Sequence, residues 1–172
     1  MNIKLRKYTL DDQKDLAKQA NNPDVSKYLR NIFPYPYTCI DALNFLSYIT
    51  KKNIQEGFEY AIEVDGKFAG AIGVTCFDDV YCCNGEIGYW LGKDFWHQGI
   101  MSQVLEMFIK EVFNKTNVTK LTSEVFSENI ASQKTLEKAG FILEGKLKDH
   151  IYKNNQYYDA YIYGLLKKDY HK

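Results

Sequence analysis

Hydrophobic positions along the chain follow two spacings, one typical of strands and one typical of amphipathic helices. The clearest helix covers residues 101–113, where seven apolar side chains fall on one face at i, i+3, i+4, i+7, i+8, i+11 and i+12. Residues 129–139 predict a shorter helix, followed by Gly140 where a helix-ending glycine belongs. Another apolar face predicts a helix that begins after Thr38 and ends near Gly57.

The N-terminal part predicts a strand, a helix and then an irregular loop. Ile3 and Leu5 begin a short strand, and Thr9 with Asp12 has the capping-box spacing of a helix start. The Asn-Asn-Pro sequence at 21–23 should end that helix. Two prolines within 31–37 exclude regular structure there, because each fixes φ and removes a hydrogen-bond donor.

Strands account for most of the remaining chain. Asp65-Gly66 is a strong hairpin signal between two of them. The predicted order is β-α-α-β-β-β-α-β-α-β-β. A strand, helix, strand succession requires a right-handed crossover between parallel strands, so we expect one α/β domain over 1–172 with a mixed sheet and helices on both faces. The predicted strands after the first are 59–64, 67–77, 84–91, 120–125, 141–152 and 157–165.

Composition excludes several classes of protein. The 172 residues carry 22 basic and 22 acidic side chains, and only Arg6 and Arg30 are arginines, so we expect no DNA partner. No apolar run reaches 18 residues, and the first ten residues do not resemble a signal peptide, so we expect a cytoplasmic protein with no membrane partner. The four cysteines and three histidines lack metal-ligand spacing, so we expect no metal and reduced thiols.

The stretch from Glu86 to Ser102 carries the first chemical signal. It is a predicted strand, a glycine-containing loop and a helix start, which together present free backbone N–H groups and the positive end of a helix dipole. Gly99 would let the backbone approach a phosphate group. The same pattern also occurs in ordinary tight loops, so by itself it leaves both interpretations open.

Residues 96–101, Trp-His-Gln-Gly-Ile-Met, resemble the acetyl-CoA motif of the GNAT N-acetyltransferase superfamily, Gln/Arg-x-x-Gly-x-Gly/Ala. Residues 129–141 are similar to the second cofactor motif of that superfamily. The stretches 33–38, 144–153 and 159–165 are similar to its ribosomal-protein-alanine, or RimJ/RimL-type, branch. The resemblance implies a GNAT-like sheet splayed between the fourth and fifth strands, with acetyl-CoA as cosubstrate. Trp96, Met101 and Leu136 depart from the usual pattern, and Leu136 stands where many members carry a catalytic tyrosine.

The resemblance also implies how acetyl-CoA would be held. Backbone groups at the end of the 84–91 strand should pair with the pantetheine arm, and backbone N–H groups of the following loop should hold the pyrophosphate. Asn129 should either cap its helix or bond the pantetheine amides. The expected cofactor-binding residues are Tyr89, Trp90, Leu91, His97, Gln98, Gly99, Ile100, Met101, Ser102, Asn129 and Ser132.

Two residues are candidates for the catalytic roles. Ser132 shares a helix face with Leu136 and Ala139, so its hydroxyl should point inward, where it either bonds its own helix or meets the sulfur of CoA. Glu86 lies on a largely apolar strand and is either a rim carboxylate or the base that accepts the proton of the amine. An α-amino group is about 250-fold more often neutral than a lysine at pH 7, which favours a protein or peptide N-terminus as acceptor.

The predicted reaction is direct acetyl transfer to a primary amine in a ternary complex. Two other functions stay open: acetylation of a small-molecule amine such as an aminoglycoside or a polyamine, and CoA binding without turnover. The chain is expected to act as a monomer or a homodimer. The acceptor groove is expected to be bordered by Phe33, Tyr35, Tyr37, His150 and Tyr158.

Overall fold

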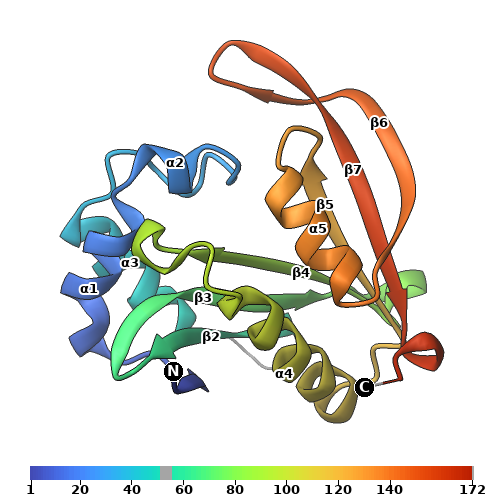
Figure 1. The fold of residues 1–172 in the computed structure, drawn as a ribbon, viewed down its shortest axis with the longest axis horizontal. Helices are drawn as coiled ribbons and strands as arrows, with labels where there is room; N and C mark the ends of the chain where they lie inside the picture. The colour runs from blue at the N-terminus through green and yellow to red at the C-terminus, as the bar shows by residue number, and fades with distance from the viewer. Residues whose placement is uncertain (51–55, 172) are drawn as a thin grey trace.

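A computed structural model describes residues 1–50 and 56–171 (Figure 1). Its strands form one seven-stranded sheet in the order β1-β2-β3-β4-β5-β7-β6. Neighbouring strands are antiparallel except β4 and β5, which are parallel and joined by a helical crossover. The strands are β1 (Ile3–Arg6), β2 (Gly57–Val64), β3 (Lys67–Cys76), β4 (Asn84–Leu91), β5 (Lys120–Phe126), β6 (Ile142–Lys153) and β7 (Gln156–Leu166).

Helices cover both faces of this sheet, and each face has its own core. One core contains the buried side of α4 (Ile100–Lys115) and residues of α5 (Ile130–Lys138). The other contains residues of α1 (Gln13–Ala20) and α3 (Cys39–Ile49). Side chains that alternate along a central strand therefore enter different cores. The predicted mixed sheet with helices on both faces is confirmed.

Most predicted elements lie where the pattern placed them. The hairpin turn at Asp65-Gly66 has positive φ at both residues, as a tight two-residue turn with that sequence requires. Both capping boxes form, at Thr9 and at Thr38. The α1 helix ends before Pro23, but this proline then begins an additional short helix, α2 (Pro23–Ser26), at a position where proline needs no N–H acceptor.

One helix boundary was predicted wrongly. The α3 helix ends at Ile49 rather than near Gly57, and Gly57 instead begins β2. Part of that predicted stretch, 51–55, lies outside the described residues. Gly57 takes φ 115°, and a Cβ there would stand 2.0 Å from the carbonyl oxygen of Val74. The apolar spacing of 42–49 gave no signal of this close strand contact.

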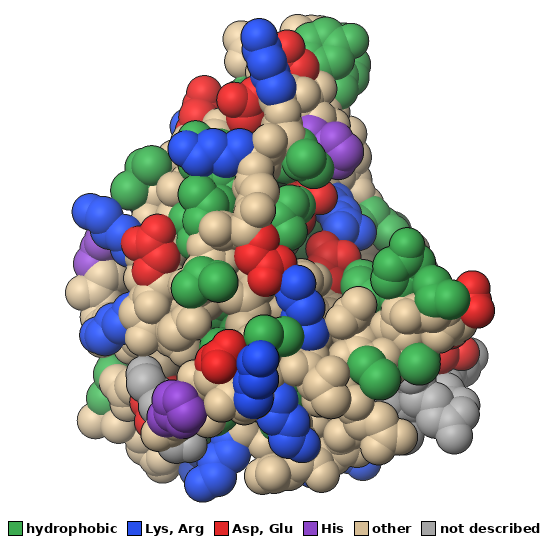
Figure 2. All heavy atoms as spheres, turned by 90° about the vertical axis from the view of Figure 1, so that its right-hand side faces the viewer, with side chains coloured by type: hydrophobic (Ala, Val, Ile, Leu, Met, Phe, Trp, Pro, Cys, Tyr) green, Lys and Arg blue, Asp and Glu red, His purple; other side chains and the backbone are tan. Residues whose placement is uncertain are grey.

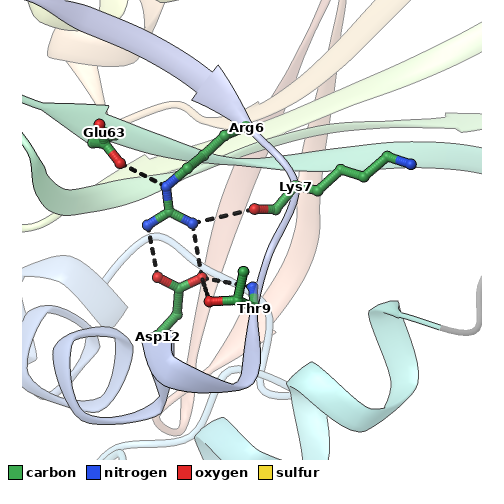
Figure 3. A network of polar contacts seen from close by, with 5 residues as sticks. All are labelled: Arg6, Lys7, Thr9, Asp12 and Glu63. Carbon is green, nitrogen blue, oxygen red and sulfur yellow. Dashed lines mark hydrogen bonds and ion pairs between the residues drawn. The ribbon is translucent and has the colours of Figure 1, made fainter.

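A network around Arg6 joins the first two strands to the turn before α1 (Figure 3). The guanidinium bonds both carboxylate oxygens of Asp12, at 2.7 and 2.9 Å, and Glu63 of β2 at 2.7 Å. Asp12 also accepts the backbone N–H of Thr9 at 2.8 Å. Burial acts to raise the pKa of Asp12, but the bonds from Arg6 and Thr9 outweigh it and lower that pKa.

Candidate active site

The sheet opens between its two parallel strands. β4 and β5 pair only over 84–86 and 120–122, although both strands continue beyond these residues. Because β4 stays paired with β3 and β5 with β7, the two halves of the sheet diverge after Glu86 (Figure 1). At the start of this opening the Ser123 hydroxyl donates to the carbonyl of Ile87 at 3.1 Å. The predicted splay between the fourth and fifth strands is confirmed.

The loop after β4 presents the start of α4 to open space. Gly99 is the N-cap of α4 at φ 71°, a left-handed conformation that glycine adopts readily, and it provides no side chain to cap the helix. The first N–H groups of a helix have no intrahelical acceptor. A Cβ at Gly99 would meet nothing within 4 Å. Free donors, a positive helix end and open space together suit an anionic group such as a pyrophosphate.

Two side chains of this loop hold its shape. The indole N–H of Trp96 donates to the carbonyl of Leu91 at 2.9 Å, and the Gln98 amide donates to the carbonyl of Asp94 at 2.9 Å. Both bonds close the loop onto its own backbone. Trp96 therefore stabilises the loop rather than facing a ligand.

The other predicted cofactor residues of the loop are divided between core and surface. Ile100 is fully buried and Met101 packs against the same core, so their side chains face away from the opening. His97 is exposed and takes φ 60°. Ser102 is half-buried in the first turn of α4. For Ile100 and Met101 the backbone N–H is thus the group that could meet a ligand.

Tyr89 and Ser132 meet on the face of the sheet that carries α4 and α5. Their hydroxyl oxygens lie 2.8 Å apart, and either hydroxyl can be the donor. Asn129 is the N-cap of α5, and its side-chain oxygen accepts the N–H of Ser132 at 3.2 Å. Burial raises the pKa of Tyr89 to about 12, against the opposing effect of its bond to Ser132. The Ser132 hydroxyl thus points inward, toward β4.

Glu86 lies on the other face of β4, at the last residue that pairs with β5. Its carboxylate accepts a bond from the Arg30 guanidinium at 2.8 Å, and its side chain is 29% exposed. Gly88 is on the same face, and a Cβ there would meet nothing within 4 Å. The space beside the carboxylate is therefore open, while Tyr89 and Ser132 stand across the strand.

The proline loop contributes mainly packing side chains. Phe33 lies against Tyr37 and Trp90, with ring centroids 4.8 and 5.3 Å away. Tyr37 is buried in the α1–α3 core. Tyr35 is 54% exposed. Of the predicted acceptor residues in this loop, Tyr35 is thus the most accessible, and the Trp90 side chain belongs to the core beneath the loop.

A groove lies between the loop after α2 (residues 27–38) and the β6–β7 hairpin, and the predicted residues His150 and Tyr158 are not among the side chains that line it. This groove has a volume of about 180 Å³, and both Glu124 and Phe126 line it. His150 Nε2 lies 4.0 Å from the Glu124 carboxylate, and the Tyr158 ring stands 5.5 Å from the Phe126 ring. The two predicted residues therefore flank side chains that line the groove.

Charges of both signs are interspersed on the face shown in Figure 2, and neither sign gathers into a single patch. Within residues 1–50 and 56–171, no group of three or more His, Cys, Asp or Glu side chains is placed to hold a metal ion. No helix in these same ranges is long and apolar enough to cross a membrane.

The family assignment follows from comparison with known proteins. A model of the acetyltransferase (GNAT) domain matches residues 2–142, most of the chain. The chain belongs to the GNAT acetyltransferase family. Membership confirms the resemblance, and it identifies the protein as an acetyl-CoA-dependent N-acetyltransferase.

Individual relatives of this GNAT acetyltransferase agree with the assignment. The N-acetyltransferase p20 of Bacillus licheniformis is 28% identical over 172 residues, which cover 98% of this chain and 94% of p20. The ribosomal-protein-serine acetyltransferase of Escherichia coli K12 is 34% identical over 97 residues, 55% of this chain and 54% of that protein. The solved structure of RimL, a ribosomal L7/L12 alpha-N-protein acetyltransferase, in complex with coenzyme A has a TM-score of 0.85 at 20% identity, covering 96% of this chain and 94% of that one.

Sequence reasoning missed two residues at the site of this GNAT acetyltransferase. Arg30 reaches Glu86 from 56 positions away in the sequence, and Glu124 enters the groove from β5. Arg30 is one of only two arginines in the chain, which was the one available signal. For Glu124, the alternation along β5 predicts the face but not the groove, because the groove is made by the distant hairpin and the α2 loop.

Proposed function

We propose that this acetyltransferase acts on the N-terminal α-amino group of a protein or peptide, by direct transfer in a ternary complex without a covalent enzyme intermediate. The observation that carries this proposal is the arrangement at the opening of the sheet. The Glu86 carboxylate lies on one face of β4 beside open space, and the hydroxyls of Tyr89 and Ser132 lie on the other. The two faces can thus receive two different reactants.

The residues present fit acetyl-CoA. When bound, acetyl-CoA would supply the acetyl group, with the CoA thiol as the leaving group. The N–H groups of residues 97–102 would hold its pyrophosphate, since Gly99 leaves the necessary space. The backbone of Tyr89, Trp90 and Leu91 lies where β4 has no partner strand on the β5 side, so it could pair with the pantetheine arm. Asn129 is engaged in capping α5, which supports a positioning role for it beside Ser132.

Glu86 is the proposed base. A carboxylate near the amine would accept a proton, directly or through water, as the ammonium becomes a neutral amine. An α-amino group with a pKa of about 8 is roughly 10% neutral at pH 7, whereas a lysine near 10.4 is about 0.04% neutral. The difference corresponds to about 3 kcal/mol. A single half-exposed carboxylate therefore suits the α-amino group, which loses its proton more easily than a lysine does.

Ser132 and Tyr89 are proposed to stabilise the leaving sulfur rather than to protonate it fully. With a pKa of about 12, Tyr89 stays protonated and can donate to the Ser132 oxygen, which leaves the Ser132 proton free to point into the opening. A thiol has a pKa of about 8.5, so full proton transfer from Tyr89 would be uphill by about 5 kcal/mol. Solvent can therefore deliver the final proton.

The groove also bears on the choice of acceptor. A polyamine would need a surface lined by carboxylates, but here Glu124 shares the groove with Arg30 and Lys153. Mixed charge of this kind does not favour a polycation. The similarity to the ribosomal-protein-serine acetyltransferase and to RimL supports the N-terminus of a ribosomal protein as the acceptor. An acceptor of that kind would place the enzyme in the cytoplasm.

The test is acetyl-CoA-dependent thiol release with a panel of amines, followed by mass spectrometry of the products. The panel contains peptides with Ala and Ser N-termini, the same peptides with blocked N-termini, spermidine and an aminoglycoside. We expect release with the free peptides and one added acetyl group on the terminal amine. Turnover confined to spermidine or to the aminoglycoside would overturn the proposal.

A further inference from the structure

Arg30 places a charged, accessible guanidinium at the proposed acceptor site. The loop after α2 carries it to the opening of the sheet, where Nη2 donates to the Glu86 carboxylate at 2.8 Å. Its side chain is 72% exposed, whereas that of Glu86 is 29% exposed. A guanidinium has five N–H donors, so this single bond leaves most of its donor capacity unused.

The backbone next to Arg30 is tethered by a buried lysine. Lys153, at the end of β6, donates its ammonium hydrogens to the carbonyl of Ser26 at 2.6 Å and to the carbonyl of Leu29. Lys153 is only 8% exposed, and its ammonium group bonds the carbonyl of the last residue of α2 and a carbonyl of the loop that follows. The hairpin therefore fixes the base of the Arg30 side chain, while the guanidinium itself stays accessible.

Arg30 also lines the groove of about 180 Å³ between the loop after α2 and the β6–β7 hairpin. Lys153 lines it as well, but its ammonium is bonded to the two carbonyls. The groove thus offers one accessible cationic group, Arg30, among the side chains that the structure describes around it. An anionic group in the groove would meet a guanidinium that can bind two carboxylate oxygens at once.

We propose that Arg30 recognises a carboxylate on the acceptor, close to the amine that is acetylated. This inference rests on the proposed function, because it takes Glu86 as the base and the groove as the acceptor site. The bond between Arg30 and Glu86 confines the recognised carboxylate to within one or two residues of the amine. The acceptor class is therefore a peptide with Asp or Glu directly after its first residue, or a free amino acid through its own carboxylate.

The experiment compares matched acceptors that differ by one charge. One pair is a peptide with Asp at its second position and the same peptide with Asn there. The other pair is a free amino acid and its amide. For the wild-type enzyme we expect kcat/KM to be about 10-fold or more higher for the acidic member of at least one pair. In Arg30→Gln that ratio should fall to about one. Lys110→Gln removes one exposed charge on α4 and should keep the wild-type ratio.

Each outcome decides a separate claim. Equal rates for both members of both pairs, or the wild-type ratio retained in Arg30→Gln, would overturn the role of Arg30. A preference seen only with the free amino acid would keep Arg30 but overturn the peptide N-terminus as acceptor. Calorimetric titration of the CoA-bound enzyme with the same acceptors gives the ratio of binding affinities for the two members of each pair, without turnover. A titration in which Arg30→Gln binds both members as the wild type does would also refute the inference.

Discussion

The contact between Tyr89 and Ser132 is compatible with two roles for the tyrosine, and the substitution Tyr89→Phe distinguishes them. Tyr89→Phe removes one hydroxyl and keeps the ring that fills the space beneath α5. If the Tyr89 hydroxyl only polarises Ser132, its removal weakens one neighbouring hydrogen bond by a fraction of that bond's strength. If Tyr89 is instead the acid that protonates the sulfur, its removal eliminates general acid catalysis, typically about 10²–10⁴-fold.

The structure favours the smaller effect. A phenol with a pKa of about 12 is a poor proton donor to a thiolate, and its oxygen lies 2.8 Å from Ser132 Oγ. Losing the direct bond in Ser132→Ala should cost about 1.5–3 kcal/mol, or roughly 10- to 150-fold in kcat. Tyr89→Phe should cost about 0.5–1 kcal/mol, or roughly 2- to 5-fold. Because the two hydroxyls act in series, the double variant should be no slower than Ser132→Ala.

The assay is thiol release at saturating acetyl-CoA and acceptor, measured for both single variants and the double variant. Tyr163→Phe is the matched control, since it removes another buried tyrosine hydroxyl, bonded to Glu137 at 3.0 Å, away from the opening. It should keep the wild-type kcat. A loss of 100-fold or more in Tyr89→Phe would instead identify Tyr89 as the acid that protonates the sulfur.

Further predictions concern the base, the phosphate loop and the fold. Glu86→Gln should lower kcat/KM about 10- to 1,000-fold at neutral pH, with a smaller loss at high pH where the amine is already neutral; a loss that is equal at every pH would indicate positioning instead. Gly99→Ala should raise the KM for acetyl-CoA, because φ 71° costs a residue with a Cβ about 1–2 kcal/mol, and an unchanged KM would contradict this. Arg6→Met should reduce the free energy of unfolding by about 3 kcal/mol in a urea titration, since it leaves the Asp12 carboxylate buried and unpaired. The lowered pKa of Asp12 stabilises the wild type above about pH 4, and this stabilisation is lost as the pH falls through the folded-state pKa, so the difference between the two proteins should narrow in acid.

The sequence predicted the elements well because local chemistry determines most of them. Asp65-Gly66 needs no distant residue to form its turn, and the apolar face of α4 identifies that helix by itself. The end of α3 could not be predicted in this way. Glycine is required at position 57 because the Val74 carbonyl of the neighbouring strand approaches closely. The hydrophobic pattern of the local sequence does not predict such a contact between strands.

The site was only partly predictable for the same reason. Helical periodicity predicted that the Ser132 hydroxyl points inward, and in the structure it meets Tyr89, but the placement of Glu86 and Tyr89 on opposite faces of β4 was not predicted. The partner of Glu86 could not be predicted from the sequence. Arg30 lies on a loop whose position depends on the bond from the buried Lys153 ammonium. The bond from Lys153 to the Ser26 carbonyl, which holds this loop, joins residues 127 positions apart in the sequence.

The position of the acetyl group on a single acceptor tests the proposed N-terminal acetylation most directly. The acceptor is a peptide with a free N-terminus and one internal lysine, incubated with the enzyme and acetyl-CoA and then fragmented in a mass spectrometer. We expect acetylation of the terminal amine with the lysine unmodified, and a strongly reduced rate of terminal acetylation in Glu86→Gln. Acetylation of the lysine with a free terminus, or terminal acetylation at the wild-type rate in Glu86→Gln, would contradict the proposal.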